Sequence, residues 1–179
     1  MAALTAEQYS DIPNDHTELV DGIVVAMSPA KPDHGLICGR FCVSLGAHVQ
    51  ATAAGELLTA DPGFVTRRNP DRVRAPDVAF VSRRRMVGRD LHRFFEGSPD
   101  IAVEVISESE SARSVAAKVE EYLAAGTLLV WAANPRKDTL TVHRQDRTTT
   151  ILRPGDTLTG EDVLPGFAES VAWLLGGSR

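Results

Sequence analysis

The sequence predicts an α/β protein of the mixed α+β kind, in which a mixed β-sheet is flanked by helices and carries additional β-hairpins. Residues 101–132 are typical of a strand, a helix and a second strand, and such a unit forms a right-handed parallel crossover. Hairpin patterns over residues 17–27 and 138–153 add antiparallel pairing. The length of 179 residues fits one domain, expected over residues 1–179.

The N-terminal part is expected to contain two helices and a hairpin. A short helix is predicted over residues 4–11, and Asp21-Gly22 supplies the positive φ angles of a two-residue hairpin turn. A longer helix over residues 34–53 is predicted by apolar side chains that recur every four residues, namely Ile37, Phe41, Leu45 and Val49. We expect Gly55 to end this helix.

Three strands are expected in the middle of the chain. The first covers residues 56–67 with a bend near Pro62, and the second covers residues 74–81. Residues 83–97 are basic and are predicted to be a loop with a short helix. The third strand, residues 101–106, is almost wholly apolar, so we expect it in the centre of the sheet with both faces buried.

The C-terminal part begins with a helix predicted over residues 112–125, whose apolar residues form one stripe. A fourth apolar strand, residues 128–132, follows it. Residues 138–144 and 147–153 are expected to pair as a hairpin, and a short helix near residues 169–175 ends the chain.

The net charge of −5 argues against nucleic-acid binding through the overall field of the protein. Nine of the 19 Lys and Arg nevertheless fall between Arg67 and Arg93, which indicates a solvated loop region or a local basic patch.

Cys38 and Cys42 are expected to be buried thiols, because no further Cys or close His pair completes a zinc site with them. Without an apolar membrane span or a signal peptide, we expect a cytoplasmic protein with no membrane contact.

Two acidic residues lie in apolar strand patterns. Glu104 stands in the middle of residues 101–106, where an ionised carboxylate is costly unless it is paired or binds a metal ion. It is therefore either the partner of a buried arginine or a ligand or general base. Asp77 follows a proline in the strand of residues 74–81, which is common at strand starts but also suits a metal ligand. Two such acids on neighbouring strands could share a hard cation such as Mg²⁺.

Three further residues are weaker candidates. Lys118 lies at the edge of its helix stripe, where its ammonium could reach back to Glu104 or extend into solvent. Glu18 would join the site only if the first strand borders it, and His34 could either cap the second helix or line a pocket. Loops for nucleotide phosphates and nucleophilic serine elbows are absent from the sequence, which disfavours nucleotide-dependent transfer and serine hydrolysis.

Several motifs over residues 5–175 resemble those of the Uma-two family of restriction-endonuclease-like proteins, which belongs to the PD-(D/E)xK nuclease superfamily. The segments that carry the resemblance include residues 18–22 (ELVDG), 75–81 (APDVAFV), 99–107 (PDIAVEVIS), 118–126 (KVEEYLAAG) and 160–167 (GEDVLPGF). The resemblance implies a restriction-endonuclease-like core, a mixed sheet flanked by helices.

The resemblance also implies roles for individual residues. Asp77, Glu104 and Lys118 would be catalytic, and the metal ion would be held by Asp77 and Glu104 together with Glu18. Ile106 stands where the superfamily usually has its lysine, and Lys118 matches a lysine that has moved to the next helix. His34 and Tyr122 are expected to line the site.

The expected function is a Mg²⁺- or Mn²⁺-dependent endonuclease that hydrolyses phosphodiester bonds of DNA. Contacts to DNA are predicted for four arginines, namely Arg67, Arg68, Arg72 and Arg74. A homodimer is expected, since two cuts in a duplex suit two-fold symmetry. The alternatives are a non-catalytic DNA-associated or protein-interaction module on the same fold and a metal-dependent hydrolase of a small phosphorylated or acidic molecule.

Overall fold

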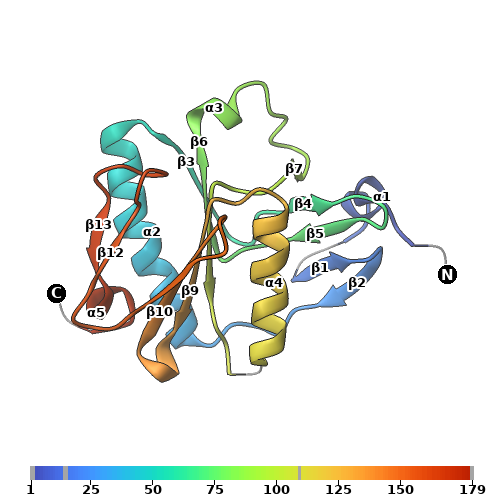
Figure 1. Ribbon diagram of the computed structural model, residues 1–179. Coiled ribbons are helices and arrows are strands. Elements are labelled where there is room, and N and C mark those ends of the chain that lie inside the picture. The colour runs from blue at the N-terminus through green and yellow to red at the C-terminus, as the bar shows by residue number, and fades with distance from the viewer. Residues whose placement is uncertain (1–2, 14–15, 109, 178–179) are drawn as a thin grey trace.

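The computed structural model describes residues 3–13, 16–108 and 110–177. A sheet of six strands lies at its centre between two helical layers (Figure 1). The strands follow the order β11 (Thr149–Leu152), β10 (Thr139–Arg144), β9 (Leu129–Asn134), β8 (Ile101–Val105), β6 (Val78–Ser82) and β3 (Gly55–Thr59). The predicted apolar strand of residues 101–106 is thus internal, and every residue of β8 is buried.

The pairing within this central sheet is mixed, as predicted. β8 and β9 are parallel and are joined through α4 (Ala112–Ala124), whereas the other neighbouring strands are antiparallel. The parallel pair needs a long connection, and the helix supplies it. The predicted hairpin of residues 138–153 is present as β10 and β11.

One face of the central sheet packs against α2 (Pro32–Thr52), which begins at Pro32 because proline suits the first turn of a helix. The predicted stripe of Ile37, Phe41, Leu45 and Val49 is buried in this core. The C-terminal elements cover the same face. They are β12 (Thr157–Thr159), β13 (Ala168–Ser170) and α5 (Val171–Leu174), of which only the helix was expected from the sequence.

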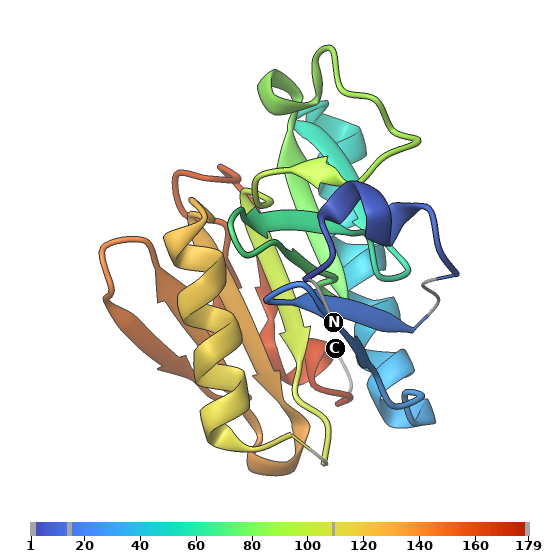
Figure 2. The ribbon, with the colours of Figure 1, turned by 90° about the vertical axis from the view of Figure 1, so that its right-hand side faces the viewer.

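The opposite face of the central sheet carries α4 and a second sheet, which lie side by side in Figure 2. The second sheet has the order β2 (Ile23–Ala26), β1 (Thr17–Val20), β5 (Arg72–Arg74), β4 (Phe64–Arg67) and β7 (Phe95–Glu96). The short helix α1 (Ala6–Ser10) packs on it. The β1–β2 hairpin is confirmed, with φ of 54° at Asp21 and 75° at Gly22.

Two predicted strands are wrong as continuous units. Residues 56–67 divide into β3 and β4, because Ala60 and Asp61 take positive φ angles of 64° and 57° and turn the chain into the other sheet. Residues 74–81 divide into β5 and β6, since Pro76 cannot donate a hydrogen bond to a strand partner. Each division moves the chain between the two sheets, and the site lies where the sheets meet.

The basic segment of residues 83–97 begins with the short helix α3 (Arg83–Met86) and ends in β7. In Figure 1, α3 follows the last residue of β6. Its arginines therefore lie at the end of that strand opposite to Asp77, which directly precedes the first residue of β6. The connection from β9 to β10 is a short 3₁₀ helix, Pro135–Lys137. Within the described part of the chain, no helix is both long and apolar enough to cross a membrane.

Candidate active site

Glu104 lies on the face of β8 that α4 covers, together with Ala102, because alternate side chains of a strand share a face. The residue is only 6% exposed. Both carboxylate oxygens have partners: the Tyr122 hydroxyl donates to Oε1 at 2.8 Å and Lys118 Nζ donates to Oε2 at 3.2 Å. Glu104 is therefore a paired buried acid, with a lysine rather than an arginine as its cation.

Asp77 lies directly before β6, which corrects the prediction that it stands inside a strand. Pairing between β6 and β8 begins with Val78 opposite Val103, so the next antiparallel position places Asp77 beside Glu104. Asp77 Oδ2 accepts a hydrogen bond of 2.6 Å from the amide of Val105. This bond satisfies a backbone donor beyond the last strand pair and holds the carboxylate at the end of β8.

Two residues of α4 reach Glu104. Lys118 and Tyr122 are four residues apart and so lie on the same side of the helix. Lys118 Nζ also lies 3.0 Å from Glu110 Oε1, so its ammonium bridges two carboxylates. Tyr122 is fully buried and supports Glu104 from within the core. The expected reach of Lys118 back to the strand of Glu104 is present, while its catalytic role stays a prediction.

Burial controls the protonation of this pair. Removal from water raises the pKa of Glu104 to about 7, although the ammonium of Lys118 opposes the rise. Burial alone would lower the pKa of Lys118, but the negative charges of Glu104, Glu18 and Glu110 outweigh it, so this pKa is raised. Lys118 is consequently charged at neutral pH, whereas Glu104 exchanges its proton near neutrality.

Glu18, on β1, borders the site from the second sheet. Its Oε2 accepts a hydrogen bond of 2.6 Å from Arg74 Nη1, and its Oε1 accepts one of 3.2 Å from the amide of Ala75. Arg74 Nη2 also donates to Glu121 Oε2 of α4 at 2.8 Å. This buried ion network connects β1, β5 and α4 beside Glu104.

All four arginines predicted to contact DNA have carboxylate partners. The partners are Asp21 for Arg67; Glu7, Asp71 and Glu96 for Arg68; Asp21 and Glu121 for Arg72; and Glu18 and Glu121 for Arg74. None of these four arginines is among the described residues that line the cleft at Glu104. Their contact with DNA stays a prediction, and each would have to exchange a carboxylate for a phosphate.

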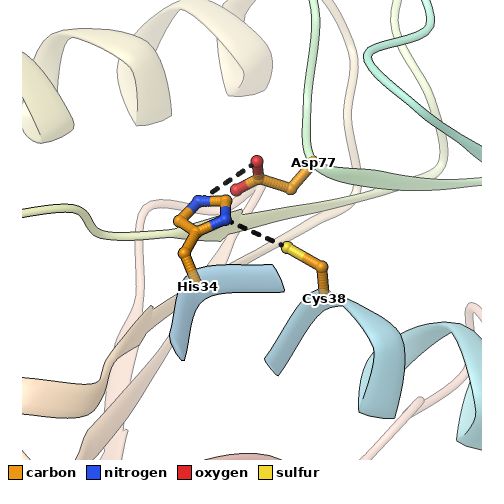
Figure 3. A group of neighbouring side chains, drawn as sticks. All are labelled: His34, Cys38 and Asp77. Carbon is orange, nitrogen blue, oxygen red and sulfur yellow. Dashed lines mark hydrogen bonds and ion pairs between the residues drawn. The ribbon is translucent and has the colours of Figure 1, made fainter. Parts of the chain in front are cut away.

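The first turns of α2 bring His34 and Cys38 to Asp77 (Figure 3). His34 Nε2 lies 3.3 Å from Asp77 Oδ1, and His34 Nδ1 lies 3.4 Å from Cys38 Sγ. Hydrogen bonding to Asp77, and then to Cys38, raises the pKa of His34 to about 10. His34 is therefore a cation at neutral pH, and it lines the cleft.

A cleft of about 750 Å³ is lined by residues of both sheets and of the start of α2, including Glu18, His34, Asp77, Glu104 and Lys118. Tyr122, which was predicted to line the site, is fully buried and is not among these lining residues. Both acidic and basic side chains face the cleft. The acids are Glu18, Asp33, Asp61, Asp77, Glu104, Glu108 and Glu110, and the bases are His16, Lys31, His34, Lys118 and Arg136. The cleft can therefore take up a cation among its acids and an anion beside its bases.

The carboxylates fit a hard divalent cation, because Mg²⁺ and Mn²⁺ prefer oxygen ligands. Asp77 and Glu18 both raise the pKa of Glu104, so the negative charges are close enough for a shared cation to relieve their repulsion. A second donor set has a different chemistry. One ligand atom each from His34, Cys38 and Asp77 lies within 4.8 Å of the others.

The sequence carried one overlooked signal for this second set. His34 and Cys38 are spaced i, i+4 on a helix, whereas Cys38 was considered as a metal ligand only together with Cys42 in the prediction. The sequence carried no such signal for Glu110 and Glu121. Glu110 pairs with Lys118 and Glu121 pairs with Arg74, and these contacts form only in the folded chain.

The fold is nuclease-like. A solved structure from Anabaena variabilis ATCC 29413, described as "a putative nuclease belonging to DUF820", superposes with a TM-score of 0.82 at 17% sequence identity, covering 96% of this chain and 97% of that chain. The model of the Uma2 family, described as "Putative restriction endonuclease", matches residues 6–172. The chain therefore belongs to the Uma2 family, and the predicted family and fold class are confirmed. No curated protein matches the sequence.

Proposed function

We propose that this protein is a Mg²⁺- or Mn²⁺-dependent endonuclease that hydrolyses phosphodiester bonds of DNA. The observation that carries the proposal is the contact of 3.2 Å between Lys118 Nζ and Glu104 Oε2, next to Asp77, which directly precedes the neighbouring strand β6. Two acids and a lysine around one cleft form the group that phosphodiester hydrolysis requires: ligands for a cation and a positive charge beside the phosphate.

Asp77 and Glu104 would hold the metal ion, with Glu18 as a further ligand. All three line the cleft and offer only oxygen atoms, which suits Mg²⁺ or Mn²⁺. A bound divalent ion would supply positive charge to the phosphate and lower the pKa of a water molecule. Tyr122 fixes the orientation of Glu104 through its hydrogen bond to Oε1, so the carboxylate needs little rearrangement to act as a ligand.

Lys118 would stabilise the negative charge that develops on the phosphate in the transition state or orient the attacking water. Its side chain is 18% exposed, and its ammonium is held between Glu104 and Glu110. A cation that is fixed in advance in a partly buried site stabilises developing charge without reorganisation. The raised pKa of Lys118 keeps it protonated for this task.

The DNA backbone would approach through the open side of the cleft, where Lys31 and Arg136 are exposed. Contacts of this kind position the phosphates but do not read the base sequence. They would supply local positive charge for the phosphates in a protein whose net charge is −5. We expect a homodimer, for which sedimentation analysis provides the test.

Cleavage of supercoiled plasmid and of a labelled duplex, with Mg²⁺ or Mn²⁺ against EDTA, tests the proposal. We expect cleavage by the wild type and a loss of about 10²-fold or more in Asp77→Asn, Glu104→Gln and Lys118→Met. Matched controls are Glu56→Gln, an exposed acid on β3, and Lys137→Met, an exposed lysine of the 3₁₀ helix; both should cleave at the wild-type rate.

Cleavage that survives both carboxylate substitutions would overturn this mechanism. Binding of DNA without cleavage, with an affinity that falls steeply as salt rises, would instead favour the non-catalytic module. Calorimetric titration with Mn²⁺ separates the cases further: absence of both heat and thermal stabilisation would exclude a metal-dependent hydrolase.

A further inference from the structure

Three side chains of different ligand chemistry meet at the start of α2. The imidazole of His34 and the thiol of Cys38 are one helical turn apart and lie on the same side of the helix. The carboxylate of Asp77 reaches them from the segment before β6, and the three groups point toward one another (Figure 3). None of the three is more than partly exposed.

Two contacts among these side chains have lengths that also occur between neighbouring ligands of a tetrahedral zinc ion. Bond lengths of about 2.3 Å to sulfur and about 2.0–2.2 Å to nitrogen and oxygen put neighbouring ligand atoms roughly 3.3–3.6 Å apart. The observed contacts are 3.4 Å for Cys38 Sγ and 3.3 Å for Asp77 Oδ1. These two contacts involve different nitrogens of His34. Zinc binding therefore requires a small movement that brings one nitrogen to both partners. One ligand atom from each of the three residues already lies within 4.8 Å of the others.

The identity of the donors selects the metal. Mg²⁺ takes oxygen ligands almost exclusively, whereas thiolate together with imidazole favours Zn²⁺. Three protein ligands leave a fourth position for water, since the cleft is open to solvent on this side. Cys42, the next cysteine on the same helix, is absent from the ligand set.

We propose that His34, Cys38 and Asp77 form a zinc site that shares Asp77 with the carboxylate centre. On binding, the Cys38 thiol and the protonated His34 imidazole each lose one proton to solvent, and Sγ, the freed His34 nitrogen and an Asp77 oxygen each donate a lone pair to Zn²⁺. Zinc occupancy withdraws Asp77 from Glu104 and so inhibits the cation-dependent reaction. The inhibition rests on the proposed nuclease function, but the zinc site does not.

Titration of the metal-free full-length protein with Co²⁺, the usual spectroscopic substitute for Zn²⁺, tests the site. We expect one equivalent to bind with a thiolate-to-cobalt charge-transfer band in the near ultraviolet, which Zn²⁺ then abolishes. Cys38→Ser should lose the band and weaken Zn²⁺ binding at least tenfold, whereas Cys42→Ser should retain both. A wild type without the band, or a Cys38→Ser variant with unchanged Zn²⁺ affinity, would overturn the proposal.

Alkylation of the wild type provides a readout that needs no variant. Stoichiometric Zn²⁺ should slow the reaction of iodoacetamide with Cys38 and leave that of Cys42 unchanged, as followed by mass spectrometry of the peptides. Equal rates with and without Zn²⁺ would contradict the site even if Cys38→Ser failed to fold.

The activity readout is separate. With each protein normalised to its own Mg²⁺-dependent rate, Zn²⁺ should inhibit the wild type and Cys42→Ser strongly and Cys38→Ser at least tenfold more weakly. Zinc that binds at Cys38 without inhibiting would overturn the sharing of Asp77. A protein that cleaves no DNA would defeat the proposed function, while the cobalt band and the Zn²⁺ affinity would still decide whether the site exists.

Discussion

Replacing Glu104 by glutamine should change how the stability of the protein depends on pH. Burial raises the pKa of Glu104 from its ordinary value of 4.5 to about 7 in the folded state. In the unfolded chain the ordinary value returns. Between these two pKa values the folded state binds more protons than the unfolded state, so the free energy of unfolding falls as pH rises. Glutamine cannot ionise, so the variant lacks this contribution.

The size of the effect follows from the two pKa values. One pKa unit corresponds to about 1.36 kcal/mol. Between pH 4.5 and pH 8, the free energy of unfolding of the wild type should therefore fall by about 3 kcal/mol more than that of Glu104→Gln. With a urea m-value of about 2 kcal/mol/M, this corresponds to a midpoint shift of about 1.5 M. The pKa of His34 is also raised, to about 10, but its contribution is present in both proteins and cancels in the comparison.

Urea unfolding of both proteins in EDTA, at several pH values between 4.5 and 8, measures the difference. Glu56→Gln is the matched control, since Glu56 is exposed on β3, and its stability should follow the wild type throughout. Parallel stability curves for the wild type and Glu104→Gln would refute the reasoning, because they would mean that Glu104 titrates alike in the folded and unfolded states.

Three further substitutions test individual contacts. Tyr122→Phe removes the donor to Glu104 Oε1, worth about 1.5 kcal/mol to the ionised carboxylate, and should raise the pKa of Glu104 by about one unit in a carbon-13 NMR titration; an unchanged titration would contradict the contact. Arg74→Met removes the arginine that pairs with the buried Glu18 and one of the two arginines that pair with the buried Glu121. It should lower the free energy of unfolding by about 3–5 kcal/mol, against less than about 1 kcal/mol for the exposed ion pair lost in Arg147→Met. Gly22→Ala places a Cβ atom against the Cβ of Ala3 at a φ of +75°, and should cost about 1–3 kcal/mol in thermal unfolding; an unchanged Tm would contradict this close approach.

Local patterns predicted most of the secondary structure because they depend on neighbours in the chain. The four-residue apolar repeat located α2, the apolar run located β8, and Asp21-Gly22 located the β1–β2 turn. The bend near Pro62 was predicted, but the division into two sheets was not. The change of sheet depends on positive φ angles at Ala60 and Asp61, which are not glycines.

The site shows the same limit. Glu104 was conspicuous because a carboxylate in a buried strand needs a partner, and that argument requires only the strand pattern. The identity of each partner requires the fold. Arg74, for example, pairs with Glu18 of the neighbouring strand β1 and with Glu121 of α4, and the sequence pattern indicates neither partner. A pattern indicates the face on which a side chain lies but not the residue that it meets there.

Asp77 is the residue at which the two proposed cation sites come together. Its Oδ2 is committed to the amide of Val105, so Oδ1 is the oxygen with more freedom to meet a cation, and His34 already lies 3.3 Å from it. His34 is charged at neutral pH, so it acts as a counter-ion that an incoming cation must displace or deprotonate. An ion that prefers oxygen ligands would replace the imidazolium of His34 at Asp77 and bind beside Glu104. A thiophilic ion would instead keep His34 as a ligand together with Cys38. The donors that accompany Asp77 would therefore determine which metal chemistry the cleft performs.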